Sequence, residues 1–230
     1  MKNAFLKWIG LGAAGVGVTL AAFEAGSTPA AKPKVNSDGA GALPLWSDAD
    51  FLDLQALCLR LKMNPADLLL VMASESGLQP SAVNPRGGAA GLIQWTSATN
   101  DCMKLTEVQR QQIPSKSVAE QLPLVERYFR CIAWTRDGKT YPHAGSVYQA
   151  IFAPGLMSRG SGLDVVLYRK GVDGRAYLDN EGLDVARKGT ITVGDLVSRM
   201  RSVSTREVYA SGLCRLRQVT GVPYEPGLPS

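Results

Sequence analysis

The spacing of apolar residues predicts a mainly helical chain. Apolar side chains recur every three or four positions through residues 51–61 and again through residues 122–132, which is the period of an α-helix. Each run follows a capping sequence, the first starting at Ser47 and the second at Ser117. We expect both segments to form helices that pack through their apolar faces. A short strand is expected at residues 165–168, in a hairpin or in a lid.

A third helix is delimited at both ends by the sequence. Asn64 is a favoured N-cap residue, Pro65 suits the first helical position, and Gly77 can end the helix in a left-handed conformation. Glu75 therefore falls in the last turn, where unpaired carbonyl groups carry partial negative charge. This charge, together with exclusion of water by apolar neighbours, raises the pKa of a carboxyl group, as a general acid requires.

The segment after this helix is rich in turn formers and small residues. Pro80 and the pair Asn84–Pro85 predict turns, and Gly87, Gly88 and Gly91 follow among alanines. A backbone with so few large side chains can be approached closely by other groups. The segment therefore suits the wall of a substrate site.

Glu75 and this small-residue segment together resemble the signature of soluble lytic transglycosylases and goose-type lysozymes. Order and spacing match, while Asn84 stands where that family usually has Ser and Ile93 where Met is commoner. A weaker match to the tyrosine motif of the family surrounds Tyr148. The matching residues of the main signature are Glu75, Ser76, Pro80, Ala82, Gly88, Ala89, Gly91, Leu92, Ile93 and Gln94.

The resemblance covers residues 48–154 and implies a lysozyme-like, two-lobed α+β fold that is predominantly α-helical. It implies that Glu75 is the catalytic acid and that no cofactor takes part. The residues that it places at the substrate are Ser76, Gly88, Ala89, Gly91, Gln94 and Tyr148.

The substrate implied by the resemblance is the glycan of peptidoglycan, cleaved between N-acetylmuramic acid and N-acetylglucosamine. Glu75 would protonate the leaving oxygen. In a lytic transglycosylase the same carboxylate then takes the proton of the muramyl 6-hydroxyl, and the product is a 1,6-anhydro sugar. One carboxylate is therefore enough for this reaction.

Two alternatives stay open. A hydrolytic lysozyme of the same fold normally needs a second carboxylate, and the first acids downstream of the motif are Asp101 and Glu107. Because neither stands within the motif, the sequence favours the transglycosylase. The other alternative is a non-catalytic structural or wall-binding component of a phage virion or a secretion machine.

The N-terminal part of the chain differs from the rest. Residues 1–23 hold two lysines before an uncharged run rich in Gly and Ala, which resembles a signal sequence or a weak membrane anchor. Residues 24–44 lack apolar periodicity and indicate a flexible tether, and the lysozyme-like domain spans residues 45–230. This organisation predicts a periplasmic protein or one tethered to the inner membrane and facing the periplasm, with a phage virion as the alternative.

The net charge, the cysteines and the single histidine limit which partners, disulfides and metal sites are expected. The net charge of +5 is spread over the chain, which suits an anionic cell wall, and no motif predicts a specific nucleic-acid partner. Cys58, Cys102, Cys131 and Cys214 lack metal-type spacing and allow free thiols or up to two disulfides, with the pairing open. The single histidine, His143, is expected in an exposed loop without a metal.

The segment 184–195 keeps part of a calcium-loop pattern. Acids stand at its first and twelfth positions and a glycine at its sixth. The third and fifth positions hold Ala186 and Lys188 in place of oxygen ligands, so we expect no metal there. Thr192 and Asp195 instead predict the cap of a helix.

Overall fold

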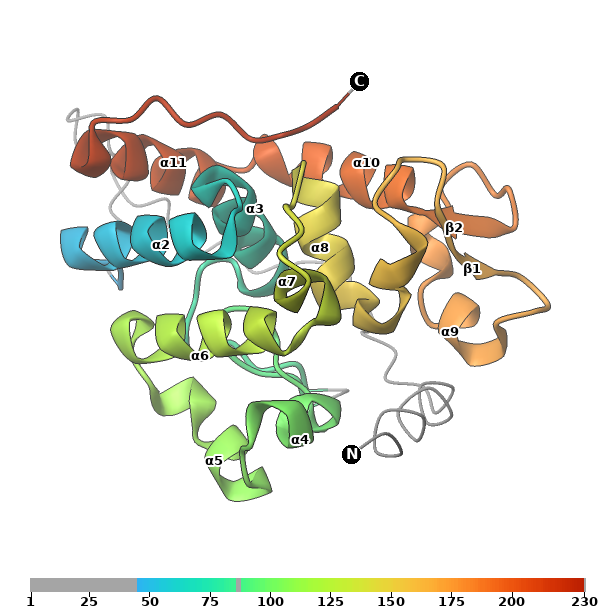
Figure 1. Ribbon diagram of the computed structural model, residues 1–230, viewed down its shortest axis with the longest axis horizontal. Coiled ribbons are helices and arrows are strands. Elements are labelled where there is room, and N and C mark those ends of the chain that lie inside the picture. Colours follow the sequence, from blue (N-terminus) through green and yellow to red (C-terminus); the bar gives the residue numbers. More distant parts are fainter. Residues whose placement is uncertain (1–44, 86–87, 230) are drawn as a thin grey trace, which may run out of the picture.

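The computed structural model describes residues 45–85 and 88–229 of the chain. At its centre lies α3 (Pro65–Ser76), whose side chains from Pro65 to Ala73 are all buried. The helices packed against α3 are α2 (Asp48–Leu61), α8 (Ala144–Phe152), α10 (Val193–Ser204) and α11 (Glu207–Thr220) (Figure 1). Only the last turn of α3 is partly exposed.

Both ends of α3 form as the sequence predicts. The Asn64 side chain accepts a hydrogen bond from the Ala66 N–H at 3.0 Å, and Pro65 takes the first helical position. Gly77 ends the helix with a φ of 60°, a left-handed conformation that costs glycine little. Glu75 is therefore fixed in the last turn.

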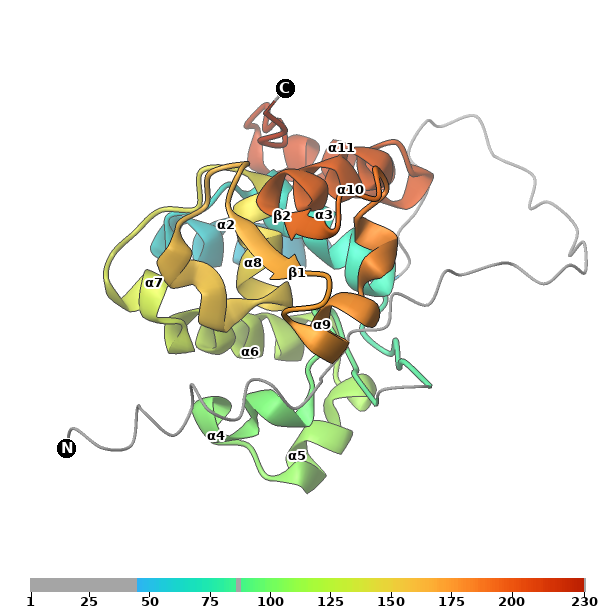
Figure 2. The same ribbon diagram turned by 90° about the vertical axis from the view of Figure 1, so that its right-hand side faces the viewer.

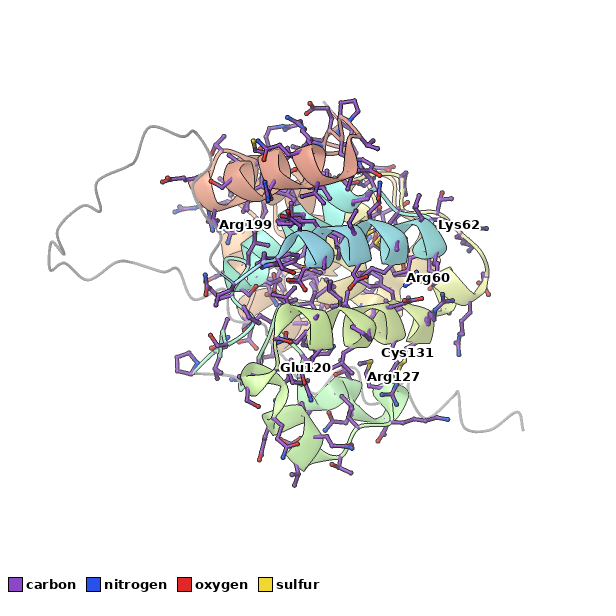
Figure 3. The ribbon with its side chains drawn as sticks, turned by 90° about the vertical axis from the view of Figure 1, so that its left-hand side faces the viewer. Arg60, Lys62, Glu120, Arg127, Cys131 and Arg199 are labelled. Atoms are coloured by element: carbon purple, nitrogen blue, oxygen red, sulfur yellow. A yellow bond between two sulfur atoms is a disulfide. The ribbon has the colours of Figure 1, made fainter. Side chains whose placement is uncertain are left out.

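A second layer is formed by α6 (Val118–Cys131), which packs against α2. Ser117 caps α6 through a capping box with Glu120, as predicted. Figure 3 shows α11, α2 and α6 one beside the other, and Arg60 of α2 forms an ion pair with Glu126 of α6 at 2.6 Å. Both helices predicted from apolar spacing are thus confirmed.

A disulfide joins Cys102 of α4 (Asn100–Met103) to Cys131 at the end of α6. It holds α4 beside the C-terminal end of α6 (Figure 3), and α5 (Glu107–Gln111) follows α4 along the chain. Cys58 is a buried free thiol, and Cys214 is a partly buried one. The pairing that the sequence leaves open is therefore one disulfide and two thiols.

Strands within the described residues form one antiparallel two-stranded sheet, β1 (Val166–Arg169) with β2 (Thr190–Thr192). Tyr168 stands opposite Ile191, and the sheet lies at one edge of the molecule near α9 (Gly174–Leu178), which lies between the two strands in the sequence (Figure 2). The predicted strand is confirmed, and its partner follows after α9 and not in a tight hairpin. The remaining short elements are α7 (Ala133–Arg136), η1 (Ser97–Thr99), η2 (Ile113–Ser115), η3 (Pro154–Arg159) and η4 (Glu181–Leu183).

The predicted class, α+β with a large excess of helix, is confirmed by these elements. None of the helices in the described part of the chain is long and apolar enough to cross a membrane. The predicted signal or anchor segment and the predicted tether, residues 1–44, lie outside the described residues.

Residues 222–229, which we call the C-terminal strap, cross the N-terminal end of α3 (Figure 1). The Gly227 N–H donates to Asp67 Oδ1 at 2.6 Å, and the Gly227 carbonyl accepts from the Ala144 N–H at 2.9 Å. Asn64 Nδ2 donates to the carbonyl of Glu225 at 2.6 Å. The strap therefore connects the starts of α3 and α8.

Asp67 should make stability depend on pH. Burial raises the pKa of Asp67 to about 7, against a usual 3.8, and the Gly227 hydrogen bond only partly opposes this. The folded protein thus holds this proton more tightly than the unfolded chain, so the stabilisation it provides is complete below about pH 4 and is lost as pH rises through about 7.

Asp67→Asn should remove the loss of stability at high pH, because the amide stays neutral and keeps an acceptor for the Gly227 N–H. Between pH 4 and pH 8 the free energy of unfolding should fall in both proteins. We expect the fall to be smaller in the variant by on the order of 2–4 kcal/mol. Urea denaturation across this pH range measures the difference, with Glu75→Gln present in both proteins so that Glu75 does not titrate. Equal pH slopes in the two proteins would contradict the assignment.

Candidate active site

Glu75 lies in the last turn of α3, the central helix, and is partly buried there. Burial raises the pKa of Glu75 to about 7, from a usual 4.5, while Tyr148 and Arg199 act in the opposite direction. A carboxyl group in this environment is about half protonated near neutral pH. It can therefore both donate and accept a proton there.

Tyr148 reaches Glu75 from the neighbouring helix α8. Its side chain is 1% exposed, and its hydroxyl has no partner of standard hydrogen-bond geometry among the described residues. The hydroxyl interacts with the Glu75 carboxylate and lowers the pKa of the acid. Burial and the charge of Glu75 keep the pKa of Tyr148 well above its usual value, so the hydroxyl retains its proton as a donor. The structure thus brings together the two residues that the sequence motifs single out.

The segment after α3 folds back on itself, and we call its described residues, 78–85 and 88–95, the glycine loop. The Gly91 N–H donates to the Ala82 carbonyl at 2.8 Å, and the Asn84 N–H donates to the Ala89 carbonyl at 2.7 Å. Ala90 forms bridges with Val83 on one side and with residue 95 on the other. Short backbone bonds therefore fix the shape of the loop.

Ser76 links the glycine loop to α3, and Gln94 braces the loop internally. Ser76 Oγ lies 2.9 Å from the carbonyl of Met72 and 3.1 Å from that of Leu92. Gln94 Nε2 donates to the Gly91 carbonyl at 3.0 Å, and Gln94 itself has a φ of 54°. The donor groups of both side chains are thus used within the protein.

The two predicted glycines have different surroundings. A Cβ at Gly91 would lie 2.6 Å from Ile113 Cγ2, 2.7 Å from Gln121 Oε1 and 2.7 Å from Trp95 Cζ3. Gly91 is therefore required for close packing. At Gly88 a Cβ would meet nothing within 4 Å, although the φ of +64° is also left-handed.

Gln121 was missed by the sequence analysis, although it anchors the glycine loop. Its side chain is fully buried on α6, where Oε1 accepts from the Leu92 N–H at 2.9 Å. Its Nε2 lies within hydrogen-bond distance of the carbonyls of Pro80 at 2.8 Å and of Ile113 and Lys116 at 3.0 Å. The available signal was a glutamine on the apolar face of α6, three positions after Val118.

The two acids considered as a second carboxylate are not placed as partners of Glu75. Glu107 is held by Arg110 and by Asn100, and these hydrogen bonds lower its pKa to about 2. Asp101 is exposed on α4. No carboxylate of the described residues is among the groups that shift the pKa of Glu75.

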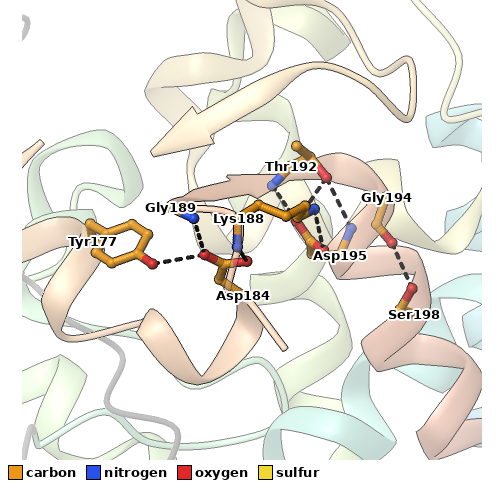
Figure 4. Close-up of polar contacts among 8 residues, drawn as sticks. All are labelled: Tyr177, Asp184, Lys188, Gly189, Thr192, Gly194, Asp195 and Ser198. Carbon is orange, nitrogen blue, oxygen red and sulfur yellow. Dashed lines mark hydrogen bonds and ion pairs between the residues drawn. The ribbon is translucent and has the colours of Figure 1, made fainter. Parts of the chain in front are cut away.

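The calcium-like loop is closed by groups of the protein itself (Figure 4). Asp184 accepts from the N–H groups of Lys188 at 2.8 Å and Gly189 at 2.7 Å. The Lys188 ammonium group lies 2.9 Å from both carboxylate oxygens of Asp195. Asp195 also forms a capping box with Thr192 at the start of α10, so the predicted cap is confirmed.

The prediction that His143 lies in an exposed loop is wrong. The residue is 9% exposed and is the N-cap of α8, where Nδ1 accepts from the Ser146 N–H at 3.1 Å. Its Nε2 lies 2.9 Å from the Ser161 carbonyl. Tertiary contacts place this ring in the interior, and burial lowers its pKa.

Comparison with known proteins gives one family match. Residues 55–120 match the model of the transglycosylase SLT domain. This match confirms the resemblance found in the sequence, and it includes Glu75 and the glycine loop but not Tyr148 or Arg199. No curated protein and no solved structure matches the chain.

Replacing Gly91 with alanine should destabilise the protein through both strain and overlap. The left-handed backbone costs about 1 kcal/mol, and displacing three packed side chains adds roughly 1–3 kcal/mol. The matched control is Gly88→Ala, for which we expect only the backbone cost. Equal losses in the free energy of unfolding, measured with urea, would show that packing at Gly91 is unimportant.

Gln121→Met should test the anchor of the glycine loop. Methionine has a similar length but cannot bond to the Leu92 N–H or the Pro80 carbonyl, so buried polar groups lose their partner. We expect a loss of roughly 2–4 kcal/mol in the free energy of unfolding, whereas Gln112→Met, at an exposed position, should change it little. A loss no larger than that of the control would refute the anchoring role.

Proposed function

We propose that this chain, whose residues 55–120 match the transglycosylase SLT domain, is a lytic transglycosylase that uses Glu75 to cleave peptidoglycan glycan strands. The observation that carries the proposal is the environment of Glu75. A single carboxyl group, partly buried at the end of the central helix and with a pKa of about 7, is suited to both proton transfers of the reaction.

In the first step, the protonated Glu75 gives its proton to the oxygen that links N-acetylmuramic acid to N-acetylglucosamine. The bond between that oxygen and the anomeric carbon breaks, and positive charge develops on the muramyl ring. The N-acetylglucosamine side leaves as an alcohol, and Glu75 is left as a carboxylate.

In the second step, the Glu75 carboxylate takes the proton of the muramyl 6-hydroxyl as its oxygen bonds to the anomeric carbon. The product is a 1,6-anhydro sugar, and Glu75 returns to its protonated form. Water is neither added nor released. The cycle therefore needs no second carboxylate and no cofactor.

Tyr148 is proposed to orient the carboxyl group of Glu75 through its hydroxyl, which has no other partner of standard geometry among the described residues. Gly88, Ala89 and Gly91 are proposed to form the backbone wall beside the sugar. Because Gln94 Nε2 is bonded to the loop, Gln94 is left with an acceptor oxygen for a sugar hydroxyl.

Ser76 bonds to the carbonyls of Met72 and Leu92. Its proposed role is to hold the glycine loop next to Glu75.

The disulfide between Cys102 and Cys131 supports the proposal that the protein works in the periplasm, because such bonds persist in oxidising compartments. A membrane tether through residues 1–23 and a role in a phage virion stay predictions from the sequence.

Product analysis tests the proposed reaction. We expect the full chain to release fragments with anhydro-muramyl ends from purified peptidoglycan, and Glu75→Gln to reduce their rate of formation at least a thousandfold, because the amide cannot donate the proton. Mass spectrometry identifies the ends, and binding to insoluble peptidoglycan should persist in the variant. Glu181→Gln, at an exposed position, is the control.

Two outcomes would contradict this proposal. Hydrated reducing ends would identify a hydrolytic lysozyme, with a second acid supplied from outside the groups that act on Glu75. Binding without any release of fragments would identify a structural or wall-binding protein.

A further inference from the structure

Arg199 lies on α10, which packs against both α3 and α8. These two helices carry Glu75 and Tyr148. Arg199 is labelled in Figure 3, and it comes from beyond the segment that matches the transglycosylase SLT domain. The helix that carries it is therefore placed by tertiary packing next to the helices of the candidate site.

The side chain of Arg199 is partly buried and has an unsatisfied donor. Its Nε is buried and has no hydrogen-bond partner, and no ion pair involves Arg199 within the described residues. Six other arginines of the described chain are paired with carboxylates. These are Arg60, Arg110, Arg130, Arg175, Arg215 and Arg217.

A buried donor without a hydrogen-bond partner is costly, so the position of the Arg199 Nε calls for an explanation. The charge of Arg199 acts on three groups, which are Glu75, Tyr148 and Arg206 at the start of α11. Glu75 is the only carboxyl group among the three. A carboxylate paired with Arg199 would cancel most of its charge. Because no described carboxylate forms such a pair, the positive charge of Arg199 acts on Glu75.

The other ionisable groups around Glu75 do not provide a positive charge. Tyr148 of α8 and Tyr128 of α6 both respond to the charge of Glu75, and burial keeps both hydroxyl groups protonated. The charge of Arg199 lowers the pKa of Arg206, but Arg206 is not among the groups that shift the pKa of Glu75. The stabilisation of an ionised Glu75 by a full charge thus comes from Arg199.

We propose that Arg199 is a positioning residue of the active site, whose unpaired positive charge stabilises the Glu75 carboxylate formed between the two proton transfers. This role rests on the proposed function, because only a group that acts as acid and then as base needs its ionised form to be accessible. Burial alone would hold Glu75 in its protonated form. The charge of Arg199 offsets part of that effect, without a direct ion pair that would fix the acid in its ionised state.

The test compares a neutral and a charged replacement in the full chain. Arg199→Gln removes the charge, and Arg199→Lys keeps it on a different group. The matched control is Arg175→Gln, because Arg175 is 79% exposed and pairs with Asp179 at the surface. Thermal unfolding checks that each variant is folded, and Arg199→Met, which keeps the apolar stem, replaces the glutamine variant if that protein fails to fold.

The first measurement is a titration of the Glu75 carboxyl carbon by NMR with labelled glutamate, with the signal assigned by its loss in Glu75→Gln. We expect the midpoint to rise by roughly half a pH unit or more in Arg199→Gln, because an opposite charge is removed. It should stay near the wild-type value in Arg199→Lys and in the Arg175 control. This measurement requires no turnover, so it tests Arg199 even if the proposed function fails.

The second measurement is the rate of anhydro-product formation against pH. The fall in rate at high pH should move upward by the same amount in Arg199→Gln, and Arg199→Lys should restore its position. An unchanged NMR midpoint in the folded neutral variant would overturn the proposal. An equal shift in the lysine and glutamine variants would also overturn it, because packing rather than charge would then be the cause.

Discussion

The burial of α3 is the constraint on which the rest of the structure depends. A helix whose side chains are buried from Pro65 to Ala73 must be covered from several directions, and the elements that cover it come from sequence positions as distant as α2 and α11. Its two ends therefore lie in unusual environments for ionisable groups. Asp67 at the first turn and Glu75 at the last turn both have a pKa raised to about 7, in each case mainly by burial. Asp67 is bonded to the strap, while Glu75 interacts with Tyr148 and with the charge of Arg199.

The glycine loop is held by buried apolar side chains, which are Leu78, Leu92, Ile93 and Trp95, and by polar contacts with neighbouring elements. Gln121 bonds to both arms of the loop, at Pro80 and at Leu92, and Gly91 lets Trp95 and Ile113 approach the backbone. A buried amide is well suited to this task because it offers donors and an acceptor without a charge. The glycine loop is consequently held by α6, whose own position is fixed by α2 and by a disulfide.

Features set by neighbouring residues could be predicted from the sequence, and features set by tertiary packing could not. Asn64 and Gly77 delimit α3 through local hydrogen bonds and backbone conformation, and Thr192 with Asp195 caps α10 in the same local way. Glu75 could be found because its motif is contiguous. Gln121 was overlooked because its partners lie up to 41 positions away, and the role of His143 as a buried cap depends on the strap and on Ser161. The acid and the tyrosine could be named, whereas the arginine that acts on both could be found only after α10 had been placed.

The contact between Asp67 and Gly227 spans 160 positions, and this separation has a consequence for the order of folding. Contacts of such long range form late, because closing a large loop costs chain entropy before the contact can contribute. During synthesis, the segment that carries the motif emerges well before the helices that enclose it. A chain that stops short of α10 and α11 lacks two of the helices that pack against α3 and the positive charge of Arg199 that acts on Glu75. The segment that matches the transglycosylase SLT domain is thus complete in the nascent chain before the last helices that surround Glu75 have been made.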